Sequence, residues 1–110
     1  MLPADSPDHE WAIPLRERLR SKFLRYTGEL GRIYEETGEF NKAIETLKKG
    51  IEVDHLAEEF YQRLMTCYHR LGRRAEALAI YNNLTKIFST TIGLSPSSQT
   101  EAIYKTLLSG

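Results

Sequence analysis

Residues 30–44 read LGRIYEETGEFNKAI, and residues 64–78, at a shift of 34 residues, read LMTCYHRLGRRAEAL. Four positions of these two stretches are identical, and they are the ones that a helical hairpin requires. The identical pairs are Leu30/Leu64, Tyr34/Tyr68, Gly38/Gly72 and Ala43/Ala77. Glycine suits the left-handed residue that ends a helix, and alanine keeps a helix slim where it crosses another. The stretch therefore predicts two successive hairpins of paired helices.

A 34-residue unit of two helices joined by a glycine turn resembles the tetratricopeptide repeat. One such hairpin has too little apolar surface to stand alone, so neighbouring hairpins stack and share a core. Gly31 is expected to allow close approach opposite Ala43, and tyrosines are expected to fill the seams between helices. The predicted fold is all-α: a right-handed stack of helical hairpins with a C-terminal capping helix.

Apolar residues at three- and four-residue steps extend this pattern in both directions. The first predicted helix runs from Trp11 to Thr37, and its apolar stripe is assigned to the core. Pro14 is expected near its start, where a missing N–H has no partner to lose. Asp54 and Ser97 are expected to cap later helices. The further helices are predicted over about 41–53, 55–71, 74–91 and 97–109, and the stripe of the first comprises Leu15, Leu19, Phe23, Tyr26, Leu30, Ile33 and Tyr34.

This pattern divides the chain into a linker remnant and one domain. Residues 1–10 hold two prolines and small polar or acidic residues, and they are predicted to be a loop or linker. Residues 11–109 form a single tetratricopeptide-like domain with repeat units at about 24–57 and 58–91 and a capping helix at about 97–109.

The composition excludes several classes of protein. The formal net charge is zero, so the chain as a whole does not carry the basic excess of a nucleic-acid-binding protein. One cysteine cannot form an internal disulfide. The N-terminus lacks the pattern of a signal peptide, and no apolar run is long enough to span a bilayer. We therefore expect a cytoplasmic protein with no membrane partner.

Three further stretches carry a more specific resemblance. They are WAIPLRERLR (11–20), LGRRAEAL (71–78) and IGLSPSSQT (92–100), followed by Tyr104. Together they resemble the bacterial transcriptional activator domain over about residues 1–108, and the turn ending in Ser95-Pro96 is the most diagnostic part. The chain departs from the family pattern at Ser98, where proline is frequent, and at Gln99, where glutamate is frequent. His55, which follows Asp54, also stands at a position where tetratricopeptide repeats usually carry proline.

The resemblance implies a module of a bacterial transcription regulator that acts by protein contacts. Its implied partners are its own DNA-binding domain, a second copy of itself or another regulator subunit. DNA would be contacted only by a domain outside this chain, which would make the chain the C-terminal piece of a longer regulator. The alternative that remains open is a free-standing adaptor that binds a peptide or helix and has no connection to transcription.

The residues favour binding over catalysis. The three histidines are far apart in sequence, so a metal site is not expected, and no cofactor motif is present. No nucleophile elbow or phosphate-binding loop occurs, and the glutamates are interpreted as solvated helix faces, so we do not expect an enzyme. A basic run from Arg16 to Arg25 could contact phosphates, but its members point to different sides of the helix. We favour a solvated surface there.

The register of the repeat places a groove along the first helix of each pair. The mixed charge there suits a polar peptide or another helix, although a plain surface is an equal alternative because a fold does not assign function. Gly28 lies among these positions. The predicted partner-contacting residues are Arg25, Arg32, Glu35, Glu36, Glu59, Gln62, Thr66, His69 and Arg70.

Overall fold

The computed structural model of the protein describes the backbone of residues 7–110 and the side chains from Ile13 onward. Five α-helices follow one another in this part of the chain, and none of it is β-strand. They are α1 (Pro7–Glu36), α2 (Phe40–Val53), α3 (Glu58–Arg70), α4 (Arg74–Thr91) and α5 (Ser98–Leu108). The all-α prediction is confirmed.

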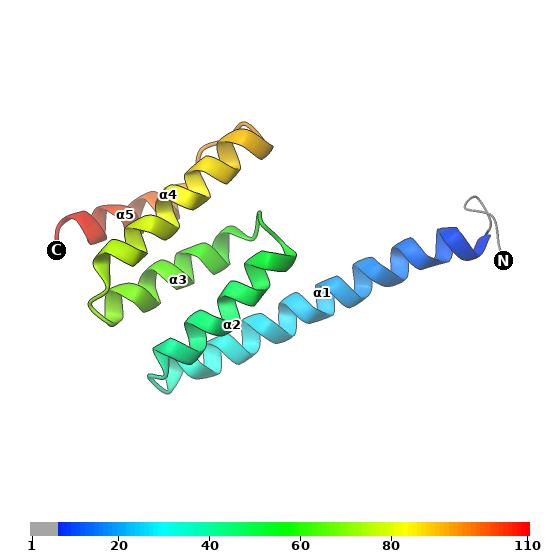
Figure 1. Cartoon of the computed structure of the whole chain (residues 1–110), viewed down its shortest axis with the longest axis horizontal. Helices are drawn as coiled ribbons and strands as arrows, with labels where there is room; N and C mark the ends of the chain where they lie inside the picture. The colour runs from blue at the N-terminus through cyan, green and yellow to red at the C-terminus, as the bar shows by residue number, and fades with distance from the viewer. Residues whose placement is uncertain (1–6) are drawn as a thin grey trace.

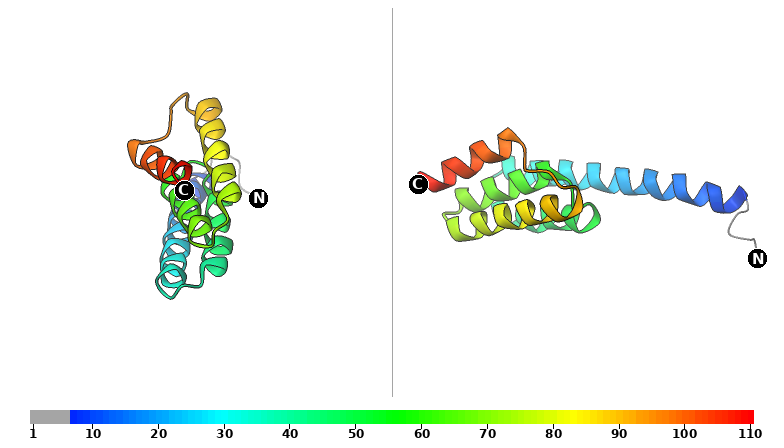
Figure 2. Two further views of the ribbon diagram at one scale, coloured as in Figure 1. Left: turned by 90° about the vertical axis from the view of Figure 1, so that its left-hand side faces the viewer. Right: turned by 90° about the horizontal axis from the view of Figure 1, so that it is seen from above.

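The helices form two antiparallel hairpins, α1/α2 and α3/α4, joined side by side through α2 and α3 (Figure 1). The short α5 packs against both α3 and α4, and this arrangement can be followed from a second direction in Figure 2. No helix in the described residues has the length and apolarity needed to cross a membrane.

The two hairpin turns have the same backbone geometry. Gly38 and Gly72 adopt positive φ angles of 78° and 72°, as the repeat predicted. In each turn the residue after the glycine donates its N–H to the carbonyl of the tyrosine that lies four residues before the glycine. The bonds are Glu39 N to Tyr34 O and Arg73 N to Tyr68 O, both 2.8 Å. Such a bond closes the exposed end of a helix after a left-handed residue, so the 34-residue repeat extends to individual hydrogen bonds.

Small residues allow the helices to approach closely. Ala43 and Ala77 are fully buried, as predicted. Gly31 is buried as well, and a Cβ there would lie 3.2 Å from Leu47 Cδ2. Among the glycines, Gly50 of α2 has the least free space, because the ring of Phe60 of α3 covers it. Most of the larger core cluster comes from α2 and α3, where the two hairpins meet, and a smaller cluster lies between α3 and α4.

The first helix differs from its prediction in three ways. It begins at Pro7, so residues 7–10 are helical and not the predicted loop, while residues 1–6 lie outside the described part. Pro14 consequently lies in the second turn. The predicted apolar stripe is mostly uncovered: Leu19, Tyr26 and Ile33 are 56%, 63% and 56% exposed.

Helix length explains why the first half of the stripe is exposed, and the choice of packed face explains the second half. At about 1.5 Å per residue, the 30 residues of α1 extend roughly 45 Å and the 14 of α2 roughly 21 Å, so α2 cannot cover the first half of α1. The face of α1 that packs is a different one, with Leu24 half-buried and Thr27 and Gly31 buried. The assignment of Leu15, Leu19, Phe23, Tyr26 and Ile33 to the core is therefore wrong.

One of the two predicted caps is confirmed. Ser97 precedes α5 and accepts a hydrogen bond from Thr100 N at 3.4 Å. Asp54 does not cap α3, whose N-cap residue is Ala57. The Asp54 carboxylate instead accepts the N–H of Leu56 at 3.0 Å, because the chain makes an extra turn before α3 begins.

Candidate partner-binding groove

A hollow of about 440 Å³ lies between α1 and α3. We call it the α1–α3 groove. Apolar atoms of Leu24, Ala57 and Phe60 line it together with charged side chains of both signs. The polar and backbone lining comes from Arg25, Gly28, Glu29, Arg32, Glu58, Glu59 and Arg63. The groove thus offers an apolar surface among charges, which is the usual composition of a site that binds a segment of another protein.

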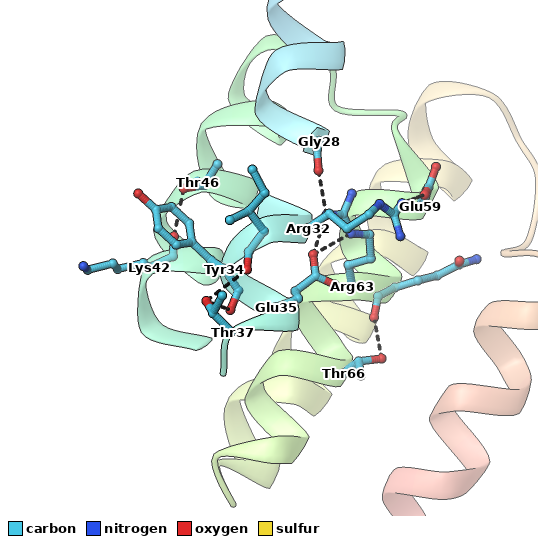
Figure 3. Close-up of polar contacts among 12 residues, drawn as sticks. Gly28, Arg32, Tyr34, Glu35, Thr37, Lys42, Thr46, Glu59, Arg63 and Thr66 are labelled. Atoms are coloured by element: carbon cyan, nitrogen blue, oxygen red, sulfur yellow. Dashed lines mark hydrogen bonds and ion pairs between the residues drawn. The ribbon is translucent and has the colours of Figure 1, made fainter. Parts of the chain in front are cut away.

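Arg63 joins the two sides of the groove (Figure 3). Its guanidinium Nη2 donates to Gly28 O at 2.9 Å, and its Nε donates to Glu35 Oε2 at 2.9 Å. Nη2 forms a second, very short contact with the same Glu35 oxygen. The side chains are only 11% and 23% exposed. Removing one partner would leave the other charge largely buried, so this pair holds α1 and α3 in place.

Arg32 and Glu59 form a second ion pair across the groove, with 3.6 Å between Nη2 and Oε1. Unlike the Arg63 pair, both side chains are well exposed, at 59% and 67%. An exposed pair of this kind contributes little to stability. A charged group on a bound partner can therefore replace either member of this pair. The exposed Arg25 lines the same groove.

The other side of α3 meets α5 through a polar network. Glu58 accepts from Ser97 N at 2.7 Å and forms a very short contact with the Thr100 hydroxyl. Gln62 Nε2 donates to Thr100 Oγ1 at 2.9 Å. Burial opposes ionisation of Glu58, but the hydrogen bonds from Thr100, Ser97 and Gln62 outweigh it, so its pKa lies below the ordinary value. An ionised Glu58 thus helps to fix α5 on α3.

The predicted groove residues fall into different environments. Arg25, Arg32 and Glu59 line the α1–α3 groove, as does Gly28. Thr66 and His69 line a separate hollow of about 130 Å³ between α3 and α5.

The remaining four line neither of these hollows. Glu35 and Gln62 are engaged by Arg63 and Thr100. Arg70 stacks over the ring of Phe40 of α2, 5.0 Å from its centroid. Glu36 is exposed at the last residue of α1.

The sequence pattern missed Arg63, Glu29 and Glu58, and it placed Phe60 only in the core. Arg63 and Glu35 are 28 residues apart on different helices, so no local spacing connects them. Phe60 serves two purposes, since one edge of its ring lines the groove while the ring itself covers Gly50.

Stacked antiparallel helix pairs with glycine turns and a groove between the first helices define a tetratricopeptide-like domain of the kind that binds other proteins. The chain belongs to the bacterial transcriptional activator domain family, whose model matches residues 1–108.

Part of the chain is also similar to a second kind of protein. It is 42% identical over 48 residues to lipopolysaccharide assembly protein B of Escherichia coli strain K12, and equally to the same protein of serotypes O6:H1 and O157:H7. The match covers 43% of this chain and 12% of each relative. The chain thus corresponds to a small part of those proteins. No solved structure gave a significant match.

Proposed function

We propose that this chain is a non-catalytic, cytoplasmic interaction module of a bacterial transcription regulator, and that its α1–α3 groove binds a charged segment of another regulator domain or subunit. The family match over residues 1–108 is the observation that carries this proposal. The groove supports it, because Arg25, Arg32 and Glu59 are exposed while Arg63 and Glu35 hold the walls. In this proposal, a DNA-binding domain outside residues 1–110 makes the DNA contacts.

The mechanism is the capture of a segment on a preformed surface. A partner segment with an apolar residue flanked by charges would place that residue against Leu24 and Phe60. Its charges would replace one or both members of the exposed Arg32–Glu59 pair. Because the Arg63–Glu35 pair keeps α1 and α3 in position before binding, little ordering of the groove opposes association.

The test compares three forms of the full chain in its own host: the parent protein, Arg25→Glu and Lys49→Glu. Arg25 lines the groove, whereas Lys49 is exposed on α2 and does not line it, so both variants make the same charge change. After cross-linking and affinity capture, we expect the parent and Lys49→Glu to retain a DNA-binding protein or an RNA polymerase subunit. Arg25→Glu should lose it. Equal recovery by all three forms would contradict the proposal that the groove binds the partner.

The similarity to lipopolysaccharide assembly protein B favours one alternative, an adaptor unconnected with transcription. In that case the proteins lost with Arg25→Glu would belong to lipopolysaccharide assembly, and no transcription protein would be recovered with the parent chain. The same capture experiment therefore separates the two functions.

A further inference from the structure

The uncovered apolar stripe of α1 is the largest feature that the groove does not use. Five of its six members are exposed by 40% or more, and the sixth, Leu30, is half-buried. The members are Leu15, Leu19, Phe23, Tyr26, Leu30 and Ile33. An apolar surface of this extent on a soluble domain marks a contact site. We call it the α1 stripe.

The stripe has the geometry of a helix-pairing seam. From Leu19 to Ile33 its members are spaced by 4, 3, 4 and 3 residues, the spacing at which two helices interlock their side chains. At 100° per residue all six lie within about 80° of one another around the helix. The packed face, around Thr27 and Gly31, is centred roughly a third of a turn away. A helix can therefore lie on the stripe without displacing α2, and Figure 1 shows the first half of α1 extending away from α2.

The area is sufficient for a weak but specific contact. The exposed parts of these side chains amount to on the order of 500 Å² per copy, so two copies would bury about 1,000 Å², the lower limit for a specific interface. A pairing through this stripe alone should therefore dissociate in the micromolar range.

The charges beside the stripe indicate the partner and its direction. Lys22 and Glu29 flank the same edge, one on each side of its centre. If two copies pair antiparallel with Phe23 of one against Tyr26 of the other, Leu19 meets Leu30. In the same register Lys22 of each copy lies near Glu29 of the other. A parallel pair would bring neither lysine to a glutamate. The helix dipoles also favour the antiparallel arrangement.

We propose that two copies of this chain associate through the α1 stripe as an antiparallel helix pair. This deepens the proposed function, because self-association is one of the contacts expected of a regulator module. It adds a second surface whose six apolar residues lie outside the α1–α3 groove, although Glu29 at its edge also lines the groove. Loss of pairing would therefore leave groove capture by the single chain intact, and loss of groove binding through Arg25→Glu would leave pairing intact.

The first test is sedimentation of the full chain over roughly 5 to 500 µM, a range that brackets micromolar dissociation. We expect a monomer–dimer equilibrium. Tyr26→Glu should raise the dissociation constant of the dimer at least about tenfold, since the substitution places two charges at the centre of the contact. Leu94→Glu is the matched control, because Leu94 is equally exposed at 62% but lies between α4 and α5. It should dimerise like the parent, and both variants should melt like the parent.

The second test fixes the direction of the pair. Copies carrying Leu19→Cys are mixed with copies carrying Leu30→Cys and oxidised. The antiparallel register predicts a disulfide between the two kinds of copy and little within either kind, whereas the buried Cys67 does not take part. A monomer throughout the concentration range, a dimer insensitive to Tyr26→Glu, or cross-linking only within one kind of copy would each overturn the proposal.

Discussion

Gly50 is the position at which the packing of the two hairpins can be tested most sharply. It lies inside α2, and the ring of Phe60 of α3 covers it. A Cβ built on Gly50 would be 2.1 Å from Phe60 Cε2 and 2.3 Å from Cδ2. Ordinary carbon–carbon contact begins near 3.5 Å, so the ring would have to withdraw by about 1.4 Å. Phe60 is only 8% exposed and belongs to the core cluster, so the shift would disturb α2–α3 packing.

The expected cost of Gly50→Ala follows from two opposing contributions. Alanine in a helix gains about 0.8–1 kcal/mol over glycine. Overpacking a tight core position costs about 1–3 kcal/mol, and this contact is at the upper end of that range. We expect a net loss of about 2 kcal/mol in the free energy of unfolding, which corresponds to a melting temperature lower by about 10 °C for a domain of this size.

Gly28→Ala is the matched control, because it approaches the same ring from α1. A Cβ there would be 3.5 Å from Phe60 Cε1, which is ordinary contact. The helix gain should dominate, with stability higher by about 0.5–1 kcal/mol. Thermal and urea unfolding, followed by circular dichroism at 222 nm, measure both variants. If Gly50→Ala melted at or above the parent temperature, the described contact between α2 and α3 would be refuted.

Three further predictions concern other parts of the fold. Ala77→Leu should lower the free energy of unfolding by about 1–3 kcal/mol, because Ala77 is fully buried. Glu36→Leu, at an exposed position, should change it by less than about 0.5 kcal/mol. Equal urea midpoints for the two variants would contradict this. The lowered pKa of Glu58 implies stability that is present above its unfolded-state pKa and is lost as pH falls through its folded-state pKa. Glu58→Gln should therefore be less stable than the parent at neutral pH and approach it in acid, and a gap independent of pH would refute that role. Burial raises the pKa of the Cys67 thiol to about 11, so a thiol reagent at pH 8 should label the folded chain only as fast as it opens.

The turns and small-residue crossings could be predicted because they depend on local backbone geometry and on the repeat. Gly38 and Gly72 need positive φ in any arrangement of the hairpins, and Ala43 and Ala77 follow from the same 34-residue register. Ser97 was recognisable for a similar reason, since capping involves only residues within one turn of a helix.

The covered face of α1 could not be predicted from periodicity. Apolar residues recur at three- and four-residue steps on a helix that packs within the chain and equally on one that packs against another molecule. Tyr26 and Ile33 remain uncovered because α2 packs against another face of α1, the one that carries Thr27 and Gly31. The Arg63–Glu35 pair is a contact between helices, so its partners cannot be matched until the helices are placed.

The most direct test of the account is the effect of the groove on transcription. The chromosomal gene is replaced by the Arg25→Glu or the Lys49→Glu form, and RNA abundance is compared with the parent and with a deletion of the gene. We predict that Arg25→Glu alters the same transcripts as the deletion, while Lys49→Glu, with the same charge change on α2, matches the parent. If the deletion altered transcription and Arg25→Glu did not, the groove would not be the regulatory contact. If the deletion itself left RNA abundance unchanged, the assignment to transcription regulation would be contradicted.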